Sequence, residues 1–201
     1  MTTPIPSSHW AIAGIDLAGS PARPTGICIL TGDRARTQLA FDDTEILDLV
    51  RAAGPDLVPI DAPLSLPPGR REIGDRNGEH FRPCDRELQR RGIRFFPITL
   101  GPMRMLTERG LRLKAQIETE GLVPVECYPG GAIDVWGLPR QQHDREALRR
   151  GLARLGVRGL RAGLSGHELD AVAAALVGRD FFTGAAEMIG GEDGMLLPLA
   201  E

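Results

Sequence analysis

Short apolar runs closed by Gly, Pro or Asp alternate along this chain with amphipathic stretches of helical spacing. Such runs are typical of buried strands, and such stretches are typical of helices that pack on a sheet. The expected strands are 10–16, 26–31, 36–41, 57–61, 122–126 and 195–199. The expected helices are 44–53, 84–91, 102–120, 145–155 and 165–177. A meander of strands that continues as alternating helices and strands predicts a mixed α/β sheet flanked by helices.

Turn and cap residues support these boundaries. Gly32-Asp33 is a short turn between the second and third strands. Asp42 or Asp43 caps the helix that follows, and Gly54-Pro55 ends it. We expect a single domain over residues 1–201, with residues 1–9 disordered.

One connection is unusually long for a compact domain. Residues 64–83 are polar and rich in Pro, Gly and Arg. Loops of this length without regular structure are usually functional or disordered. We therefore expect a long loop here, outside the regular α/β alternation.

Four acidic residues interrupt or close apolar runs. Asp16, Asp61 and Glu126 each end a predicted buried strand, and Asp170 lies on the apolar face of the helix 165–177. Burying a carboxylate costs several kcal/mol unless something compensates its charge. Strand ends of one sheet can bring carboxylates together, and such clusters commonly hold divalent metals. We predict that all four are catalytic and ligate Mg²⁺ or Mn²⁺, as a site for two ions.

Each acid also has a purely structural explanation. Asp16 and Asp61 precede turns and could bond their own backbone. Glu126 has little turn propensity, but it could pair with a buried arginine. Asp170 could be a charge favoured by the helix dipole, although a Ser-x-x-Glu capping box, Ser165 and Glu168, already explains the helix start. We therefore interpret Glu168 as a cap and Asp170 as functional.

His167 lies three residues before Asp170, so both side chains can face one site. A histidine near a helix start often has only a structural role. Its spacing nevertheless makes it the best ligand or supporting residue among the histidines, and we include it with the predicted catalytic residues.

Arginines supply the candidate substrate contacts. Arg82 and Arg86 belong to an Arg-rich stretch after Asp61, and Ser20 lies in the turn after Asp16. Guanidinium groups bind phosphates in a bidentate way. Acidic residues are interleaved, so a solvated, salt-bridged face is the alternative. With only 4 % aromatic residues, the sequence does not predict base stacking or sequence-specific readout.

Composition excludes several other classes. The net charge of −3 does not fit a protein that simply coats nucleic acid. No apolar run is long enough for a membrane helix, and the amino terminus has no basic stretch followed by an apolar region. We expect a cytoplasmic protein without membrane contact. The three widely spaced cysteines form no CxxC pair, which makes a zinc site improbable.

Several ordered motifs resemble a known family. They are GIDLAGS, PIDAPLSLP, RPCDRELQRRG, VECYPG and SGHELDAVAAALVG. The sequence is similar in these segments to the family called domain of unknown function 429, whose members are described as predicted nucleases of the RNase H-like fold. The resemblance implies an RNase H-like mixed five-stranded sheet flanked by helices, with helical insertions. It also implies that Asp16, Asp61 and Asp170 are the acids of the first strand, the fourth strand and the last helix.

These observations favour a metal-dependent nuclease that hydrolyses phosphodiester bonds of nucleic acid or another phosphodiester substrate. Two alternatives remain open. One is an actin-like phosphotransferase or NTPase in which Gly14–Ser20 would cradle phosphates. The other is a non-catalytic binding module that retains the fold.

Overall fold

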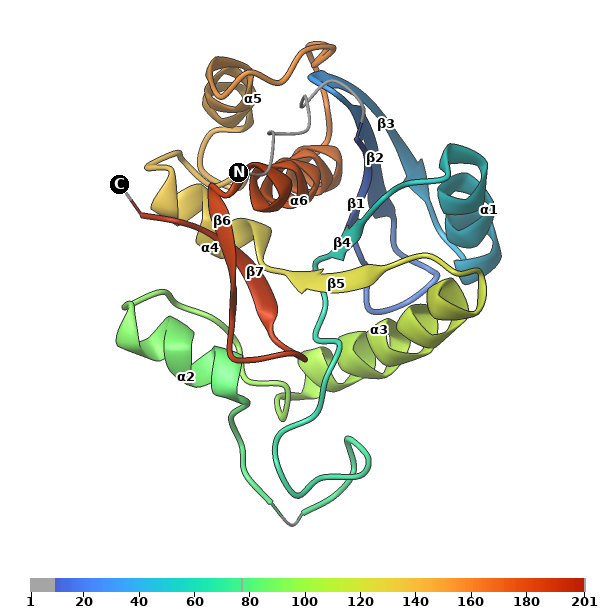
Figure 1. The fold of residues 1–201 in the computed structure, drawn as a ribbon, viewed down its shortest axis with the longest axis vertical. Helices are drawn as coiled ribbons and strands as arrows, with labels where there is room; N and C mark the ends of the chain where they lie inside the picture. The colour runs from blue at the N-terminus through green and yellow to red at the C-terminus, as the bar shows by residue number, and fades with distance from the viewer. Residues whose placement is uncertain (1–9, 77, 201) are drawn as a thin grey trace, which may run out of the picture.

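A computed structural model describes residues 10–76 and 78–200, which form one sheet flanked by helices. The predicted disorder of residues 1–9 lies outside the described residues. Figure 1 shows the sheet, whose strand order is β3-β2-β1-β4-β5-β7-β6. Its strands are β1 (Ala11–Asp16), β2 (Thr25–Thr31), β3 (Arg34–Ala40), β4 (Val58–Ile60), β5 (Pro124–Cys127), β6 (Ala186–Ile189) and β7 (Met195–Pro198).

The helices are α1 (Asp43–Ala53), α2 (Pro83–Arg90), α3 (Gly101–Thr119), α4 (Pro129–Val135), α5 (Arg145–Arg154) and α6 (Gly166–Thr183). Across the part of the chain that the structure describes, none of them has the length and apolar character needed to cross a membrane. The predicted α/β class is confirmed.

Two elements were absent from the sequence prediction. The sheet has seven strands, whereas the apolar pattern predicted six and the family resemblance implied five; the strand missing from the pattern is β6, which pairs antiparallel with β7 at the end of the sheet. Helix α4 follows β5 directly and contains Gly130 and Gly131, which have poor helix propensity. Both elements depend on tertiary packing more than on local sequence pattern.

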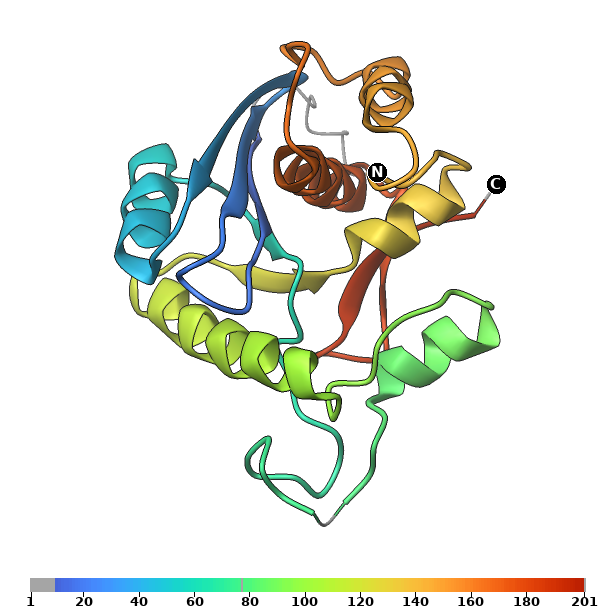
Figure 2. The same ribbon diagram turned by 180° about the vertical axis from the view of Figure 1, so that it is seen from behind.

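Helices cover both faces of the sheet (Figures 1 and 2). Helix α6 packs on β1 and β2, and α4 and α5 pack on α6; their apolar side chains form one core. Helices α1 and α3 lie over the other face with a second core. Helix α2 packs near β6 and β7 in a smaller cluster. This layering gives the sheet an α6 face and an α3 face.

The central strands run parallel, so their carboxyl ends share one edge. Ile15 of β1 pairs with Ile60 of β4, and Ile60 pairs with Glu126 of β5. Beside them, β1, β2 and β3 form an antiparallel meander, with the predicted turn at Gly32-Asp33. Gly32 has φ 58°, a conformation that favours glycine.

The helix ends confirm the predicted caps. Asp42 caps α1, since its Oδ1 accepts a hydrogen bond from Glu45 N at 2.8 Å. Ser165 and Glu168 form the predicted capping box at the start of α6. There the carboxylate of Glu168 accepts a hydrogen bond from Ser165 N at 2.9 Å. The cap interpretation of Glu168 is therefore confirmed.

Two glycines allow α6 to lie directly on the strands. A Cβ atom at Gly14 would be 2.2 Å from the carbonyl oxygen of Ala171, and one at Gly26 would be 2.0 Å from that of His167. Any larger residue at these positions would push the helix away from the sheet. Close packing therefore fixes the first turns of α6 against the carboxyl end of β1.

The segment 64–83 forms no helix or strand before α2 among its described residues. Arg70 holds part of it together, because its Nε donates to the carbonyl oxygen of Glu79 at 2.7 Å. Its described residues form an irregular connection between β4 and α2.

Candidate active site

Three of the four predicted acids gather on the α6 face at the carboxyl edge of the sheet. Asp16 is the last residue of β1, and Asp61 directly follows β4. The backbone N–H of Asp61 donates to the carbonyl oxygen of Ile15 at 2.8 Å, which holds the two strand ends together. Asp170 comes from the second turn of α6. We call Asp16, Asp61 and Asp170 the carboxylate site.

The charges of Arg140 and His167 offset the negative charge of the carboxylate site only in part. Burial raises the pKa of Asp61 well above its ordinary value, and the nearby charges of Asp16 and Asp170 raise it further. Burial and the charge of Asp16 raise the pKa of Asp170 to about 7. No described residue donates a hydrogen bond to either the Asp61 or the Asp170 carboxylate. Groups with such perturbed pKa values are typical of functional sites.

His167 joins α6 to β1. Its Nδ1 lies 2.6 Å from Oδ2 of Asp16, and because a carboxylate only accepts hydrogen bonds, Nδ1 is the donor. This hydrogen bond raises the pKa of His167. The structure thus brings His167 to the site, but in contact with Asp16 rather than with Asp170.

A buried arginine that the sequence did not indicate fixes the loop after β1. Arg109 of α3 is 1 % exposed. It donates to the carbonyl oxygens of Ala18 and Phe41, and to Asp43 Oδ1, each at 2.7 Å. The same loop contains Ser20, whose hydroxyl accepts a hydrogen bond from Ala22 N at 3.2 Å. The backbone that leaves Asp16 is therefore held from the α3 side.

Glu126 faces the other side of the sheet. It pairs in register with Ile60, so its side chain shares the α3 face with Ile60, whereas the next residue, Cys127, shares the α6 face with Asp61. The predicted strand stopped at Glu126, but β5 continues through Cys127. A shift of one residue along a strand moves a side chain to the opposite face.

A buried ion-paired network surrounds Glu126. Arg82 donates from Nη1 to Glu126 Oε2 at 2.6 Å and from Nη2 to Glu126 Oε1 at 2.8 Å. It also donates from Nη2 to Asp85 Oδ1 at 2.8 Å. Leu64 N donates to the same glutamate at 2.8 Å. Glu126 therefore pairs with a buried arginine, as our alternative interpretation of this residue had it.

The network leaves Arg82 only 3 % exposed. Burial lowers the pKa of Arg82, but the ion pairs outweigh burial and raise it. The guanidinium of Arg82 is therefore not exposed, and it is not available for the predicted contact with substrate. Arg86 is exposed and pairs with Glu79 on the surface. Arg90 and Arg91 pair with Glu87. This part of the Arg-rich stretch is therefore a salt-bridged surface, which was the alternative to a substrate contact.

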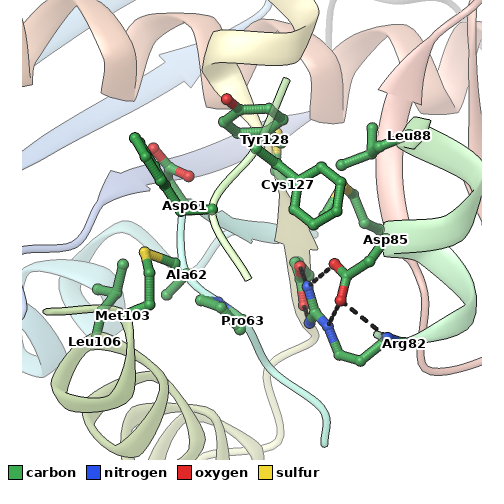
Figure 3. Close-up of a pocket in the computed structure, with 14 residues that line it drawn as sticks. Asp61, Ala62, Pro63, Arg82, Asp85, Leu88, Met103, Leu106, Cys127 and Tyr128 are labelled. Atoms are coloured by element: carbon green, nitrogen blue, oxygen red, sulfur yellow. Dashed lines mark hydrogen bonds and ion pairs between the residues drawn. The ribbon is translucent and has the colours of Figure 1, made fainter. Parts of the chain in front are cut away.

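A cavity of about 180 Å³ opens beside Asp61. Figure 3 shows Asp61 on one side of this cavity and the Arg82–Asp85 pair on the other. Apolar side chains line most of it, among them Phe95, Phe96, Met103, Leu106 and Tyr128. The sequence analysis missed these residues, since nothing in a single sequence shows that segments 95–106 and 128 meet. The adjacent pair Phe95-Phe96, in a chain with few aromatic residues, was the available signal.

The donor chemistry of the carboxylate site fits a hard divalent cation, because Mg²⁺ and Mn²⁺ prefer carboxylate oxygens. The negative charge at Asp61 and Asp170 fits it as well. Within residues 10–76 and 78–200, however, no three His, Cys, Asp or Glu side chains lie close enough to hold one ion together. Side-chain rotation would therefore have to accompany binding.

The sheet order and the packing of α6 on β1 and β2 define an RNase H-like fold. RuvC of Thermus thermophilus superposes with a TM-score of 0.50 at 13 % identity, over 94 % of this chain and 99 % of that one. T. thermophilus RuvC in complex with a Holliday junction substrate superposes with a TM-score of 0.49 at 14 % identity, over 87 % and 94 %.

The chain itself belongs to the family described as "Protein of unknown function (DUF429)", whose model matches residues 14–194. No curated protein matches it significantly by sequence. The suspected family and the RNase H-like fold are both confirmed.

Proposed function

We propose that this protein is a metal-dependent nuclease that hydrolyses phosphodiester bonds at the carboxylate site. The observation that carries the proposal is the charge of Asp61 and Asp170, which are half-buried beside Asp16 and form no ion pair with a basic side chain of the described residues. A fold keeps such repulsion only where a ligand relieves it, because it destabilises the native state. The nuclease-type fold favours nucleic acid as the substrate class.

Asp16, Asp61 and Asp170 would hold the cation. When bound, Mg²⁺ or Mn²⁺ would neutralise the carboxylates, polarise the phosphodiester and activate water for attack. Glu126 stays a predicted ligand, but to bind it would have to leave its ion pair with Arg82, so we propose the three aspartates as the principal set. The role of Glu126 would then be to fix the strand end beside Asp61.

The protein's own groups would position the reaction. His167 orients the Asp16 carboxylate by donating to its Oδ2. The same hydrogen bond raises the pKa of His167, so the imidazolium form persists to a higher pH than in a free histidine. Gly14 would not serve as the phosphate cradle of the NTPase alternative, since it lies in β1 under the backbone of α6.

Titration calorimetry with Mg²⁺ and Mn²⁺ tests the cation site. Wild type should bind, and Asp61→Asn and Asp170→Asn should each abolish the binding. Asp180→Asn is the matched control: it removes a carboxylate from the same helix that is paired with Arg179 at 3.3 Å, and it should bind metal like wild type. A folded wild type that binds neither ion at millimolar concentration would overturn the metal site.

A labelled panel of single-stranded, duplex and branched DNA and RNA tests the nuclease activity. Cleavage should require the divalent ion and should fall by ~10²–10³-fold in Asp170→Asn, because several kcal/mol of charge stabilisation is lost. Metal binding without cleavage of any member would reject the nuclease. Phosphate release from ATP under the same conditions would favour the NTPase alternative.

A further inference from the structure

Aromatic side chains gather beside the carboxylate site although they make up only 4 % of the chain. Phe95, Phe96 and Tyr128, which we call the aromatic wall, line the cavity that holds Asp61. The same three side chains line a second cavity of about 580 Å³. Phe81 lies behind them, with its ring centroid 6.0 Å from that of Phe95. The aromatic wall therefore separates two adjoining hollows.

Phe96 is the most conspicuous member of the wall. It is 71 % exposed, more than any other large apolar side chain that the structure describes as exposed. It belongs to the segment 91–100 between α2 and α3. An exposed ring at the rim of two cavities, rather than alone on a convex surface, is typical of a binding surface.

Hydrogen bonds hold the wall in place. The hydroxyl of Tyr128 donates to the carbonyl oxygen of Arg94 at 2.7 Å, which ties the segment 91–100 to the end of β5. Nη1 of Arg140 donates to the same hydroxyl at 3.3 Å. Asp134 in turn fixes the guanidinium of Arg140 in a bidentate pair. The rings are thus preorganised, which lowers the entropic cost of binding a ligand.

Positive charge lies on the far side of the wall. Arg94 and Arg140 line the second cavity, together with Gln142. Arg94 is exposed, and its guanidinium forms no ion pair with a described residue. A ligand that crosses the wall would meet carboxylates at one end and guanidinium groups at the other, with exposed ring faces between.

We propose that the aromatic wall stacks the unpaired bases of a single nucleic acid strand and that Arg94 and Arg140 contact its phosphates on the side away from Asp61. The inference rests on the proposed function, because it names the substrate form that the carboxylate site would act on. Bases offer flat apolar faces and phosphates offer charge, which matches the two chemistries present. A fully paired duplex hides those faces, so the wall selects an unpaired segment.

Binding is measured in EDTA, so that it does not depend on the metal site. A short fluorescent single-stranded DNA is titrated with wild type, Phe96→Ala and the matched control Phe41→Ala, whose ring is 47 % exposed at the end of β3. Phe96→Ala should weaken binding by roughly 5- to 100-fold, the effect of losing one base–aromatic stack. Phe41→Ala should bind like wild type.

An oligonucleotide of the same length with abasic sites separates stacking from phosphate contact. Wild type should bind it more weakly than the normal strand, and Phe96→Ala should show a smaller difference between the two strands. Arg94→Gln should weaken both strands equally and reduce the salt dependence of binding.

Several outcomes would overturn the inference. One is equal binding of the normal strand by wild type and Phe96→Ala; another is tighter binding of a blunt duplex than of the single strand. Sedimentation that shows a wild-type dimer and a monomeric Phe96→Ala would make the wall a self-association surface instead. If binding depends on Phe96 but no strand is cleaved when metal is present, the nuclease proposal fails and the base-stacking proposal stands. If cleavage is the same in wild type and Phe96→Ala, the base-stacking proposal fails and the nuclease proposal stands.

Discussion

Two groups of acids lie at the same edge of the sheet and differ in how their charge is balanced. Asp85 and Glu126 share the guanidinium of Arg82, and each is at most 3 % exposed. Asp61 and Asp170 face Asp16 and each other, and form no ion pair with a basic side chain of the described residues. The paired group serves the fold, and the unpaired group opposes it. This contrast separates the structural from the functional acids better than burial does, since both groups are withdrawn from solvent.

Breaking the paired group should give the largest effect on stability. Arg82→Met leaves the charges of Asp85 and Glu126 buried without a partner, and we expect the free energy of unfolding to fall by ~3–5 kcal/mol. Urea denaturation followed by circular dichroism measures it. Arg86→Met, which loses only an exposed pair with Glu79, should cost less than ~1 kcal/mol. Equal losses in the two variants would mean that the buried network does not stabilise the fold.

Neutralising one member of the unpaired group should do the opposite. The folded-state pKa of Asp170 is about 7, above its ordinary value of 3.8. The native state therefore binds more protons than the unfolded chain between these values, and its stability falls as pH rises from about 4 to about 7. In EDTA, Asp170→Asn should stabilise the protein by on the order of 3 kcal/mol at pH 8.

The gain should shrink as pH falls and vanish near pH 4, where the carboxyl group is protonated in both states. Thermal unfolding of wild type and Asp170→Asn at a series of pH values measures this difference. A variant that is less stable than wild type at pH 8 would show that Asp170 supports the fold rather than strains it.

A divalent cation should offset most of that difference. A ligand that binds only the native state adds about 2.7 kcal/mol at a concentration of 100 Kd. Mg²⁺ or Mn²⁺ should therefore raise the melting temperature of wild type and leave Asp170→Asn unchanged. Arg82→Met should still gain stability from the ion, because its defect lies in the other group. An equal rise in wild type and Asp170→Asn would place the ion elsewhere.

Much of this arrangement could be predicted because it depends on local signals. Asp16 and Asp61 are each followed by turn residues, and an apolar strand precedes each of them, so their place at strand ends was readable. The capping box of Ser165 and Glu168 explained one acid and left Asp170 without a structural purpose.

The remainder depends on long-range geometry. Glu126 resembled the other strand-end acids, but it pairs in register with Ile60 rather than with Asp61, and this register places it on the opposite face. Its partner Arg82 is 44 residues earlier in the chain, where one arginine among many gave no sign of burial. Phe95, Phe96 and Tyr128 likewise meet only after α3 and β5 have packed.

Glu168 offers the smallest effect and a control for the whole comparison. It lies two residues before Asp170, and its side chain is only 6 % exposed. Burial raises the pKa of Glu168, but hydrogen bonds from Ser165, Thr37 and Arg161 outweigh burial and lower it below the ordinary value. Its charge is therefore satisfied, in contrast to that of Asp170.

Glu168→Gln should cost about 1 kcal/mol, the usual contribution of a helix cap. The sign of its pH dependence is opposite to that of Asp170, because the pKa of Glu168 is lower in the folded state than in the unfolded chain. The stability that its charge contributes is therefore present above the unfolded-state pKa, near 4.5, and is lost as the pH falls through the folded-state pKa. Thermal unfolding at pH 8 and pH 3 measures it. Because both acids belong to the same helix, a difference in sign between them can come only from their surroundings. If Glu168→Gln instead stabilised the protein at pH 8 and removed its response to Mg²⁺, the division between structural and functional acids would have to be redrawn.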